Sequence, residues 1–191
     1  MKAIVLNGAT TDNDALEVAH RIFVDDLTAR AWQVAPFILR RTEIGYCHGD
    51  FGCWVRTPGV CVFKDAAADA AMTFIRSDLA ILLTPITFGG YSSELKKALD
   101  RMICLISPFF MKLKGEIHHV KRYEQYPRIV AVGTLPEPDA EAEAIFRELV
   151  RRNAANMHAP ASAVTVILNH EPAEPIRAKL RGALEAAGVQ V

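Results

Sequence analysis

The sequence predicts an α/β domain in which helices cover both faces of a central parallel sheet. Apolar, β-branched runs recur along the chain, and most are continuous rather than alternating, as is typical of strands buried on both faces. Segments with helical periodicity separate these runs, so strand and helix alternate five times. The 191 residues, 51% of them hydrophobic, can close one sizeable core, whereas two domains would each be unusually small.

The expected elements follow one another without an obvious internal boundary, so we expect a single domain over residues 1–191. Strands are expected at 2–7, 32–39, 79–84, 129–134 and 164–168. Helices are expected at 14–29, 66–77 and 140–156, and two further apolar stripes at helical spacing cover 95–106 and 176–187. Gly188 lies where the last of these helices should stop.

Two segments, 42–64 and 107–127, do not fit this alternation. The first contains three of the four cysteines, and the second is basic, aromatic and histidine-bearing. Irregular excursions from a regular α/β frame are where binding sites and subunit contacts tend to lie.

Charge and composition narrow the classes of partner. Lys plus Arg equals Asp plus Glu, 22 against 22, so no global field would draw the protein to nucleic acid or to an anionic membrane. The apolar run at 3–6 is too short for a signal peptide, and no apolar run reaches membrane-spanning length. We therefore expect a cytoplasmic location, reduced cysteines, and small molecules or other chains as partners.

The ends of the expected strands are the places to look for a ligand. In an open α/β sheet, ligands bind outside the carboxyl ends of the strands. Three turns follow such ends, at 7–14, 84–93 and 133–139.

The second turn and the segment after it read TPITFGGYSSELKKALDR. This run resembles the loop and following helix of the flavodoxin-like NAD(P)H-dependent FMN reductase family, which carries Ser/Thr-Pro-aliphatic-Tyr/Thr-Phe-Gly, a small polar pair and a Leu-Lys…Leu-Asp-Arg helix. Gly89 and Gly90 would let the backbone approach a flat ring, and Phe88 or Tyr91 could cover a ring face. The simpler interpretation is a tight turn with Ser92 or Ser93 capping the helix.

The resemblance implies a flavodoxin-like, doubly wound five-stranded parallel sheet of order 2-1-3-4-5 that binds FMN non-covalently. NADH or NADPH would be the electron donor, and a quinone, flavin or similar small molecule the acceptor. No catalytic acid or base is required, and none is assigned. The expected flavin-binding residues are Thr10, Thr11, Asn13, Pro85, Ile86, Thr87, Phe88, Gly89, Gly90, Tyr91, Gly133 and Thr134.

The first turn departs from the family pattern. Family members carry a basic residue in a Gly-Ser-Pro-Arg/Lys…Gly-Asn-Thr phosphate loop, whereas this chain reads GATTDND. Asp12 and Asp14 suit a helix N-terminus but would repel a phosphate in the same place. An ordinary capped helix is an equal alternative, so FMN should bind weakly or take phosphate contacts from another turn or subunit. A non-enzymatic electron carrier, or a fold without flavin, is the alternative function.

The cysteine segment also resembles a family pattern, Cys-x-x-Cys-x-x-Cys followed by Thr-Pro-Gly and Cys. Here Asp50 replaces the second cysteine between Cys47 and Cys53, and Cys61 follows the Thr-Pro-Gly. A cubane iron–sulfur cluster as a rule needs four thiolates, and this segment offers three. The spacings of Cys47, His48, Cys53 and Cys61 are not those of a zinc knuckle. Cys47 and Cys53 also lack the C-x-x-C spacing of a redox pair. Structural cysteines are the favoured interpretation, and no metal is expected.

For the second excursion we favour a subunit contact, because reductases of this family often form homodimers or homotetramers. Two alternatives remain open: Lys121 or Arg122 could meet a nicotinamide cofactor's phosphate, and His118 or His119 could donate a proton.

Overall fold

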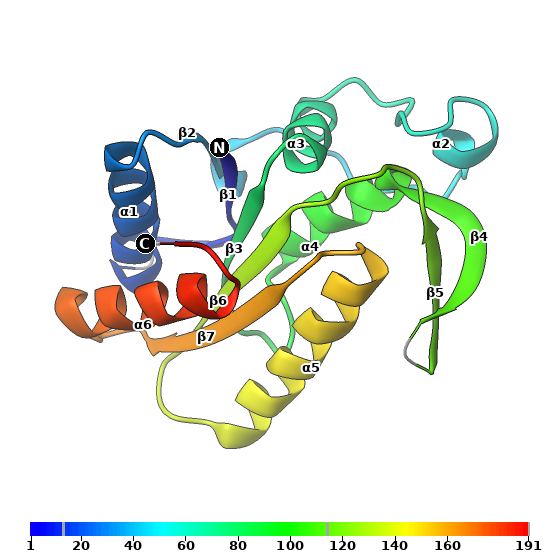
Figure 1. Ribbon diagram of the computed structural model, residues 1–191. Coiled ribbons are helices and arrows are strands. Elements are labelled where there is room, and N and C mark those ends of the chain that lie inside the picture. The colour runs from blue at the N-terminus through cyan, green and yellow to red at the C-terminus, as the bar shows by residue number, and fades with distance from the viewer. Residues whose placement is uncertain (13, 114, 191) are drawn as a thin grey trace.

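The computed structural model describes residues 1–12, 14–113 and 115–190, and its strands and helices form three layers (Figure 1). The strands are β1 (Lys2–Asn7), β2 (Gln33–Ile38), β3 (Leu79–Pro85), β4 (Ile106–Leu113), β5 (Glu116–Lys121), β6 (Arg128–Leu135) and β7 (Ser162–Leu168). The α-helices are α1 (Asp14–Ala29), α2 (Gly52–Val55), α3 (Ala66–Ile75), α4 (Ser93–Arg101), α5 (Ala140–Asn156) and α6 (Ala173–Ala186). Short 3-10 helices cover Leu39–Arg41 (η1) and Met102–Leu105 (η2).

Five strands form the central sheet in the order β2-β1-β3-β6-β7. This is the predicted flavodoxin-like order, since β6 and β7 are the fourth and fifth strands of the sheet along the chain. All neighbours are parallel, with Ala3 opposite Leu79 and Leu79 opposite Arg128. The carboxyl ends of all five strands therefore lie at one edge.

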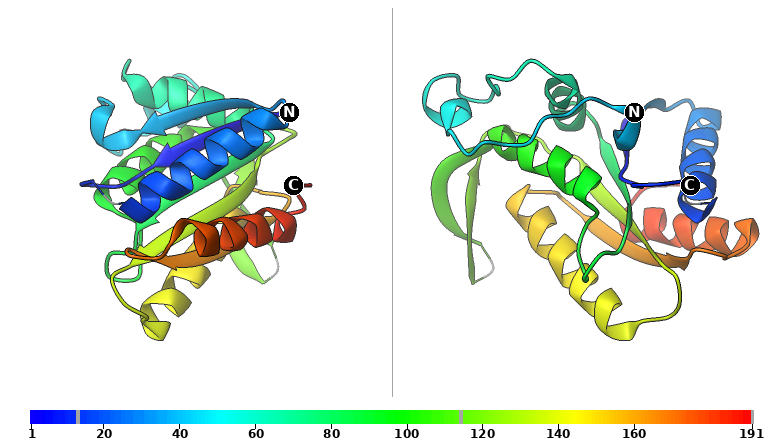
Figure 2. Two further views of the ribbon diagram at one scale, coloured as in Figure 1. Left: turned by 90° about the vertical axis from the view of Figure 1, so that its left-hand side faces the viewer. Right: turned by 180° about the vertical axis from the view of Figure 1, so that it is seen from behind.

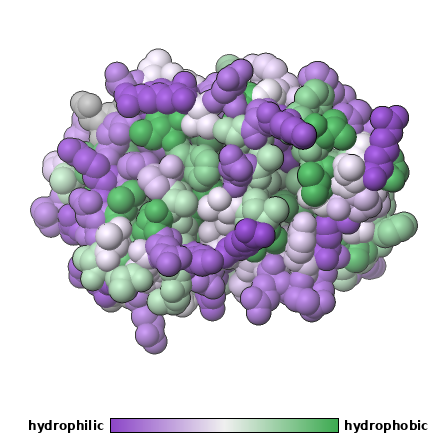
Figure 3. Space-filling view, turned by 90° about the horizontal axis from the view of Figure 1, so that it is seen from above, coloured by the Kyte–Doolittle hydropathy of each residue, from purple (hydrophilic) through white to green (hydrophobic). Residues whose placement is uncertain are grey.

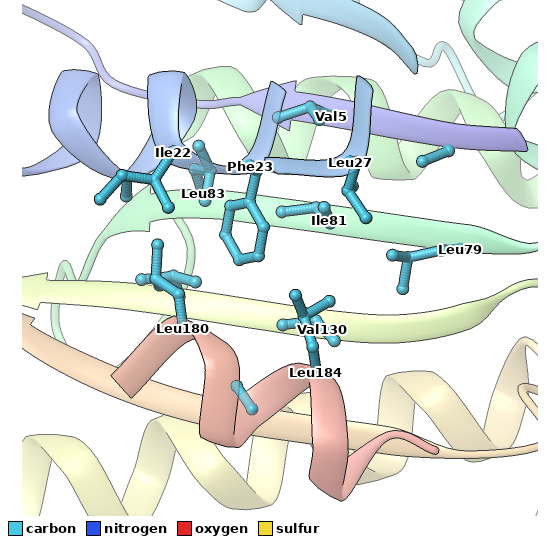
Figure 4. Close-up of a cluster of buried hydrophobic side chains, with 14 of the residues drawn as sticks. Val5, Ile22, Phe23, Leu27, Leu79, Ile81, Leu83, Val130, Leu180 and Leu184 are labelled. Atoms are coloured by element: carbon cyan, nitrogen blue, oxygen red, sulfur yellow. The ribbon is translucent and has the colours of Figure 1, made fainter. Parts of the chain in front are cut away.

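Helices α1 and α6 cover one face of the sheet (Figure 2). Figure 4 shows Phe23 and Leu27 of α1 and Leu180 and Leu184 of α6 pointing at strand residues such as Ile81. These side chains are at most 4% exposed, and burying each stabilises the fold by about 1.5–3 kcal/mol.

Helices α3, α4 and α5 cover the other face, where Phe74, Leu95 and Phe146 are almost completely buried. Each of these helices begins at a side-chain cap. Asp65 accepts from Ala67 N, Ser92 from Leu95 N, and Asp139 from Glu141 N and Ala142 N. Of the two predicted candidates, Ser92 and Ser93, the residue that caps α4 is Ser92.

Among the described helices, none is long and apolar enough to cross a membrane.

The prediction that helical spacing continues over residues 95–106 was wrong after Arg101. Helix α4 stops at Arg101, a 3-10 turn follows, and β4 begins at Ile106. Pro108 lies too far along the chain to set the stop at Arg101, but it favours the strand that follows, because the residue before a proline is disfavoured in the helical region and Ser107 is extended in β4. Met102, Ile103 and Ile106 continue the apolar spacing of the helix, so the sequence pattern did not indicate where the helix ends.

The segment 107–127, expected to be irregular, is mostly an antiparallel hairpin of β4 and β5. It forms its own two-stranded sheet and extends away from the central layers beside the C-terminal end of α4 (Figures 1 and 2). The segment 42–64 is irregular as predicted, apart from the single turn of α2.

Candidate functional site

The turns after β1, β3 and β6 meet at the carboxyl edge of the sheet. Gly8 N donates to Leu83 O at 2.7 Å, and Ile86 N donates to Thr134 O at 3.0 Å. These bonds bring the three predicted turns together at one edge.

The turn after β3 is tight and presents an aromatic ring to solvent. Thr87 N donates to Gly90 O at 3.0 Å and Gly90 N donates to Thr87 O at 2.9 Å. Between them, Phe88 has φ 50° and Gly89 φ 74°, both in the left-handed region. A non-glycine residue there costs roughly 1–3 kcal/mol, and the Phe88 ring is fully exposed. Strain combined with an exposed ring is unusual in a purely structural turn.

The glycines at this edge are required by close contacts. A Cβ on Gly8 would lie 2.6 Å from Leu95 Cβ, and one on Gly89 would lie 2.5 Å from Ile145 Cγ2. A Cβ on Gly133 would lie 2.6 Å from Ile86 Cδ1. The backbones of the three turns can therefore approach α4, α5 and one another only without side chains.

Tyr91, unlike Phe88, points into the protein. Its side chain is buried, packs edge-to-face on Phe146 at 5.8 Å, and its hydroxyl accepts from Asn153 Nδ2 at 3.3 Å. Burial raises the pKa of Tyr91 to about 12. Of the two rings predicted to cover a flavin, the structure therefore presents Phe88 and withdraws Tyr91, whose backbone still belongs to the turn.

The turn after β1 has a basic partner that its own sequence lacks. Arg40, directly after β2, donates through Nη2 to Asp12 Oδ1 at 2.7 Å and to Glu17 Oε1 at 3.1 Å. Its side chain is 13% exposed, and Nη1 is buried with no hydrogen-bond partner among the described residues. Thr10 and Thr11 are exposed, while the predicted Asn13 lies outside the described residues. Sequence reasoning missed Arg40, although the Arg-Arg pair following an expected strand was the signal for it.

Unpaired polar atoms gather at the same edge. Besides Arg40 Nη1, the Thr134 hydroxyl and Asn7 Nδ2 are buried without partners among the described residues. Such an atom costs about 1–3 kcal/mol, so its presence is explained where a ligand or ordered water completes it. A guanidinium and two exposed threonines at the same edge as an exposed ring fit a phosphate-bearing planar molecule such as FMN.

The cysteines lie away from these turns, in the segment 42–64 and in η2. Cys47 is exposed, Cys61 is partly exposed, Cys53 and Cys104 are buried, and none is in a disulfide. Burial and then the charges of Cys61, Cys47 and Asp50 raise the pKa of Cys53, and burial raises that of Cys104 to about 11. Across the described residues, no group of three or more His, Cys, Asp and Glu side chains could hold a metal ion.

The cysteine segment is held to the body by two anchors. Arg101 donates to Asp65 through Nη1 at 2.7 Å and Nη2 at 3.0 Å, and also to Gly45 O at 2.9 Å. Trp54 Nε1 donates to Ile103 O and Ile106 O. These contacts place the segment at the C-terminal end of α4, whereas the Phe88 turn precedes its N-terminal end.

The histidines of the hairpin make local contacts. His118 Nε2 lies 3.2 Å from Glu116 Oε2, His119 Nδ1 lies 2.7 Å from Ser107 O, and the His119 ring packs on Trp54 and Phe110. The hairpin follows the C-terminal end of α4, so the structure does not bring these imidazoles to the strand-end turns.

Comparison with known proteins identifies the family of this chain. Residues 1–123, nearly two thirds of the chain, match the model of the NADPH-dependent FMN reductase family, whereas no curated protein matches. Solved structures with the same fold include an NAD(P)H:quinone oxidoreductase from Methanothermobacter marburgensis, with TM-score 0.68, 12% identity and coverage of 98% of this chain and 95% of that one.

Two others are an FMN-dependent NADH-azoreductase from Bacillus anthracis in complex with FMN and an apo NADH:FMN oxidoreductase. The azoreductase has a TM-score of 0.62 and 11% identity, and the match covers 98% of this chain and 97% of the azoreductase. The oxidoreductase has a TM-score of 0.66 and 13% identity, and the match covers 97% of this chain and 87% of the oxidoreductase. At these identities the structures show the fold, and the family model shows the relationship. The chain belongs to the NADPH-dependent FMN reductase family and is an NAD(P)H-dependent oxidoreductase with FMN as its cofactor.

Proposed function

We propose that the chain holds FMN non-covalently over the turns after β1, β3 and β6 and passes electrons from NADH or NADPH to a quinone, flavin or similar small acceptor. The observation that carries this proposal is the Phe88 turn, a strained backbone with an exposed ring between two turns that carry unpaired polar atoms. A cytoplasmic location and a single-domain organisation over 1–191 belong to the same proposal.

The residues have distinct roles in this proposal. Phe88 covers one face of the ring system, and the backbone of Thr87, Gly89 and Gly90, with Pro85 and Ile86 before it, lies along its edge. Gly133 and Thr134 approach from β6, and Thr10, Thr11 and Arg40 surround the phosphate. FMN, when bound, supplies the two-electron chemistry, and the protein supplies orientation, exclusion of water and charge.

Absorbance and turnover together test this function. The purified protein, mixed with FMN, should show flavin bands and should consume NADH or NADPH when a quinone is added. A yellow protein without turnover would identify a carrier, and a colourless protein that fails to quench FMN fluorescence would refute the proposed site. The exposed carboxylate of Asp12 is the observation in favour of the carrier or flavin-free alternative, and the family match favours the enzyme.

Arg40 gives a prediction specific to the phosphate. Arg40→Gln should weaken FMN binding about 10- to 100-fold, because a hydrogen bond to a charged group contributes about 1.5–3 kcal/mol. Riboflavin, which lacks the phosphate, should bind both proteins equally. The measurement is titration of flavin fluorescence.

The matched control for Arg40 is Arg177→Gln, which breaks an arginine–aspartate pair between α6 and α1 instead. Its FMN affinity should equal that of the wild type. An equal loss of FMN and riboflavin affinity in Arg40→Gln would mean that Arg40 supports the fold of the turn and does not meet the phosphate.

We also propose that the β4–β5 hairpin forms the contact between copies in a homodimer or homotetramer. Phe109, Phe110 and Ile117 are 71%, 65% and 67% exposed, on a hairpin whose strands pair only with each other among the described strands. The face seen from above in Figure 3 has apolar patches interrupted by hydrophilic side chains. The hairpin concentrates exposed apolar surface, as interaction sites do.

Changing this surface should change the oligomer. The double substitution Phe109→Glu and Ile117→Glu should reduce the mass measured by light scattering to that of one chain, because two carboxylates would have to be desolvated at the contact. Val55→Glu, at a residue 73% exposed on α2, is the control and should leave the mass unchanged. A wild-type protein that is already monomeric would contradict the proposal.

A further inference from the structure

Helix α5 lies against the turn at which the flavin is proposed to bind (Figure 2). A Cβ on Gly90 would lie 3.8 Å from Leu149 Cδ2, and one on Gly89 would lie 2.5 Å from Ile145 Cγ2. These two contacts run along one face of α5 toward its N-terminus. Glu141 is one helical turn further along the same face and is exposed. The first turn of α5 therefore extends past this strand-end turn.

Two exposed apolar side chains meet where α5 contacts the turn. Phe88 is fully exposed, and Ile145 is 49% exposed although it packs over Gly89. A single exposed aliphatic side chain needs no explanation. Next to the Phe88 ring, however, it extends the surface on which a planar apolar molecule can pack. A molecule that approaches a flavin beside Phe88 would therefore also meet α5.

This part of α5 is strongly acidic. The turn after β6 and the part of α5 before Arg147 carry four carboxylates and no Lys or Arg. Within the described residues, Asp139 caps α5 and Glu143 pairs with Arg147, whereas the side chains of Glu137 and Glu141 have no ion-pair partner. The helix N-terminus offsets only about half a unit of this charge. The negative field at this end of the edge is therefore uncompensated.

The field of Glu141 reaches the Phe88 turn. Glu141 is about 5.4 Å along the helix axis from Ile145, which contacts the turn, and the Debye length in 0.1 M salt is about 10 Å. An NAD(P)H donor carries its phosphates away from its reacting ring, whereas a small acceptor carries any charge on the ring itself. The field therefore acts most directly on the acceptor.

We propose that α5 selects the electron acceptor: Ile145 contacts its apolar ring, and the charge of Glu141 and its neighbours favours neutral or cationic acceptors over anionic ones. The carboxylates bind nothing themselves, since they act through charge on a molecule that lies beside the Phe88 turn. This inference rests on the proposed function and adds the charge class of the acceptor to it.

The probes for the test are two quinones, anthraquinone-2-sulfonamide and anthraquinone-2-sulfonate, which share a ring system and differ by one negative charge. Their affinities for the oxidised, FMN-loaded protein are measured by calorimetry without NAD(P)H, so that no turnover takes place. The ratio of neutral to anionic affinity should fall as salt is raised from about 0.01 to about 1 M, because the Debye length shrinks from about 30 to about 3 Å. A ratio that does not change with salt, or failure of both quinones to bind, would overturn the proposal.

Charge variants of Glu141 test its role. The ratio should fall about 2- to 5-fold in Glu141→Gln and about 4- to 20-fold in Glu141→Lys, because one and two unit charges change at roughly 10 Å. The control is Glu185→Lys on α6, close to Gly188, which lies beside the first residue of β6 at the opposite edge. It should leave the ratio unchanged. Equal effects at Glu141 and Glu185 would show that only net charge matters and would overturn the selection by α5.

Ile145→Ala tests the apolar contact. It should weaken both quinones about threefold or more and leave their ratio unchanged, because the lost contact does not depend on charge. Unchanged affinity for both would place the acceptor away from α5 and overturn the proposal. Titration with FMN in each variant separates this inference from the proposed function. A protein that does not bind FMN would refute both, whereas an FMN-loaded protein whose ratio is insensitive to Glu141 would refute only the selection by α5.

Discussion

Gly89→Val is expected to reduce FMN affinity at least 100-fold. Gly89 has φ 74°, where a β-branched residue is strongly disfavoured, and its new Cβ would lie 2.5 Å from Ile145 Cγ2 and 2.8 Å from Ile145 Cβ. The turn must therefore change its backbone, which breaks the reciprocal Thr87 and Gly90 hydrogen bonds and moves Phe88. Titration of FMN fluorescence measures the loss.

The stability of this variant separates a site effect from unfolding. Because the turn is at the edge of the sheet, the free energy of unfolding should fall by only about 1–3 kcal/mol, within the range for local strain. The control is Gly182→Ala, in the middle of α6 with nothing within 4 Å of the new Cβ. It should bind FMN normally and stabilise the protein by up to about 1 kcal/mol. Full FMN affinity in Gly89→Val would show that the flavin site is not at this turn.

The second large effect concerns the Arg101–Asp65 ion pair, whose members differ in burial. The Arg101 side chain is 1% exposed, whereas that of Asp65 is 19% exposed. Asp65→Asn leaves a nearly inaccessible charge without its counter-ion and should cost about 3 kcal/mol of unfolding free energy. Arg101→Met leaves a carboxylate that can recover water, and it should cost about 1–2 kcal/mol. Urea denaturation measures both.

The exposed ion pair between Arg177 and Asp26 serves as the reference for this comparison. Arg177→Met breaks the pair with Asp26, in which both side chains are 38% exposed, and should cost less than about 1 kcal/mol. A larger loss in Arg101→Met than in Asp65→Asn would contradict the argument that the burial of the remaining partner decides the cost.

The same pair predicts a pH dependence. Burial opposes ionisation of Asp65, but the hydrogen bonds from Arg101 and Gly45 outweigh it and lower the pKa of Asp65 below its ordinary 3.8. A lowered folded-state pKa stabilises the fold above the unfolded value, and this contribution is lost as the pH falls below about 4. Wild type should therefore lose stability over that range more steeply than Asp65→Asn, as measured by denaturation at each pH. Parallel curves would show that Asp65 does not titrate as argued.

Much of the fold could be read from the residues alone. Buried parallel strands produce continuous apolar runs, and all five strands of the sheet lie within a few residues of their predicted positions. The end of α4 and the hairpin were misread, because Met102, Ile103 and Ile106 keep helical spacing although the α-helix ends at Arg101.

The candidate site divides in the same way. The run TPITFGG identified the family and the turn, since its glycines and its ring are determined by local chemistry. Residues that act from a distance along the chain were not visible: Arg40 reaches Asp12 across 28 positions, and Asp65 reaches Arg101 across 36. Such pairs depend on which strands become neighbours, and a list of side chains does not contain that information.

The sequence by itself therefore determined the layered α/β fold, the strand order through its family resemblance, and the turn at which a flavin is proposed to bind, because periodicity and turn chemistry act between near neighbours in the chain. Only the tertiary structure decided that Phe88 faces solvent while Tyr91 is buried, and that a guanidinium after β2 compensates Asp12. These are consequences of packing between distant segments, where burial and the positions of partners determine what each side chain can bind.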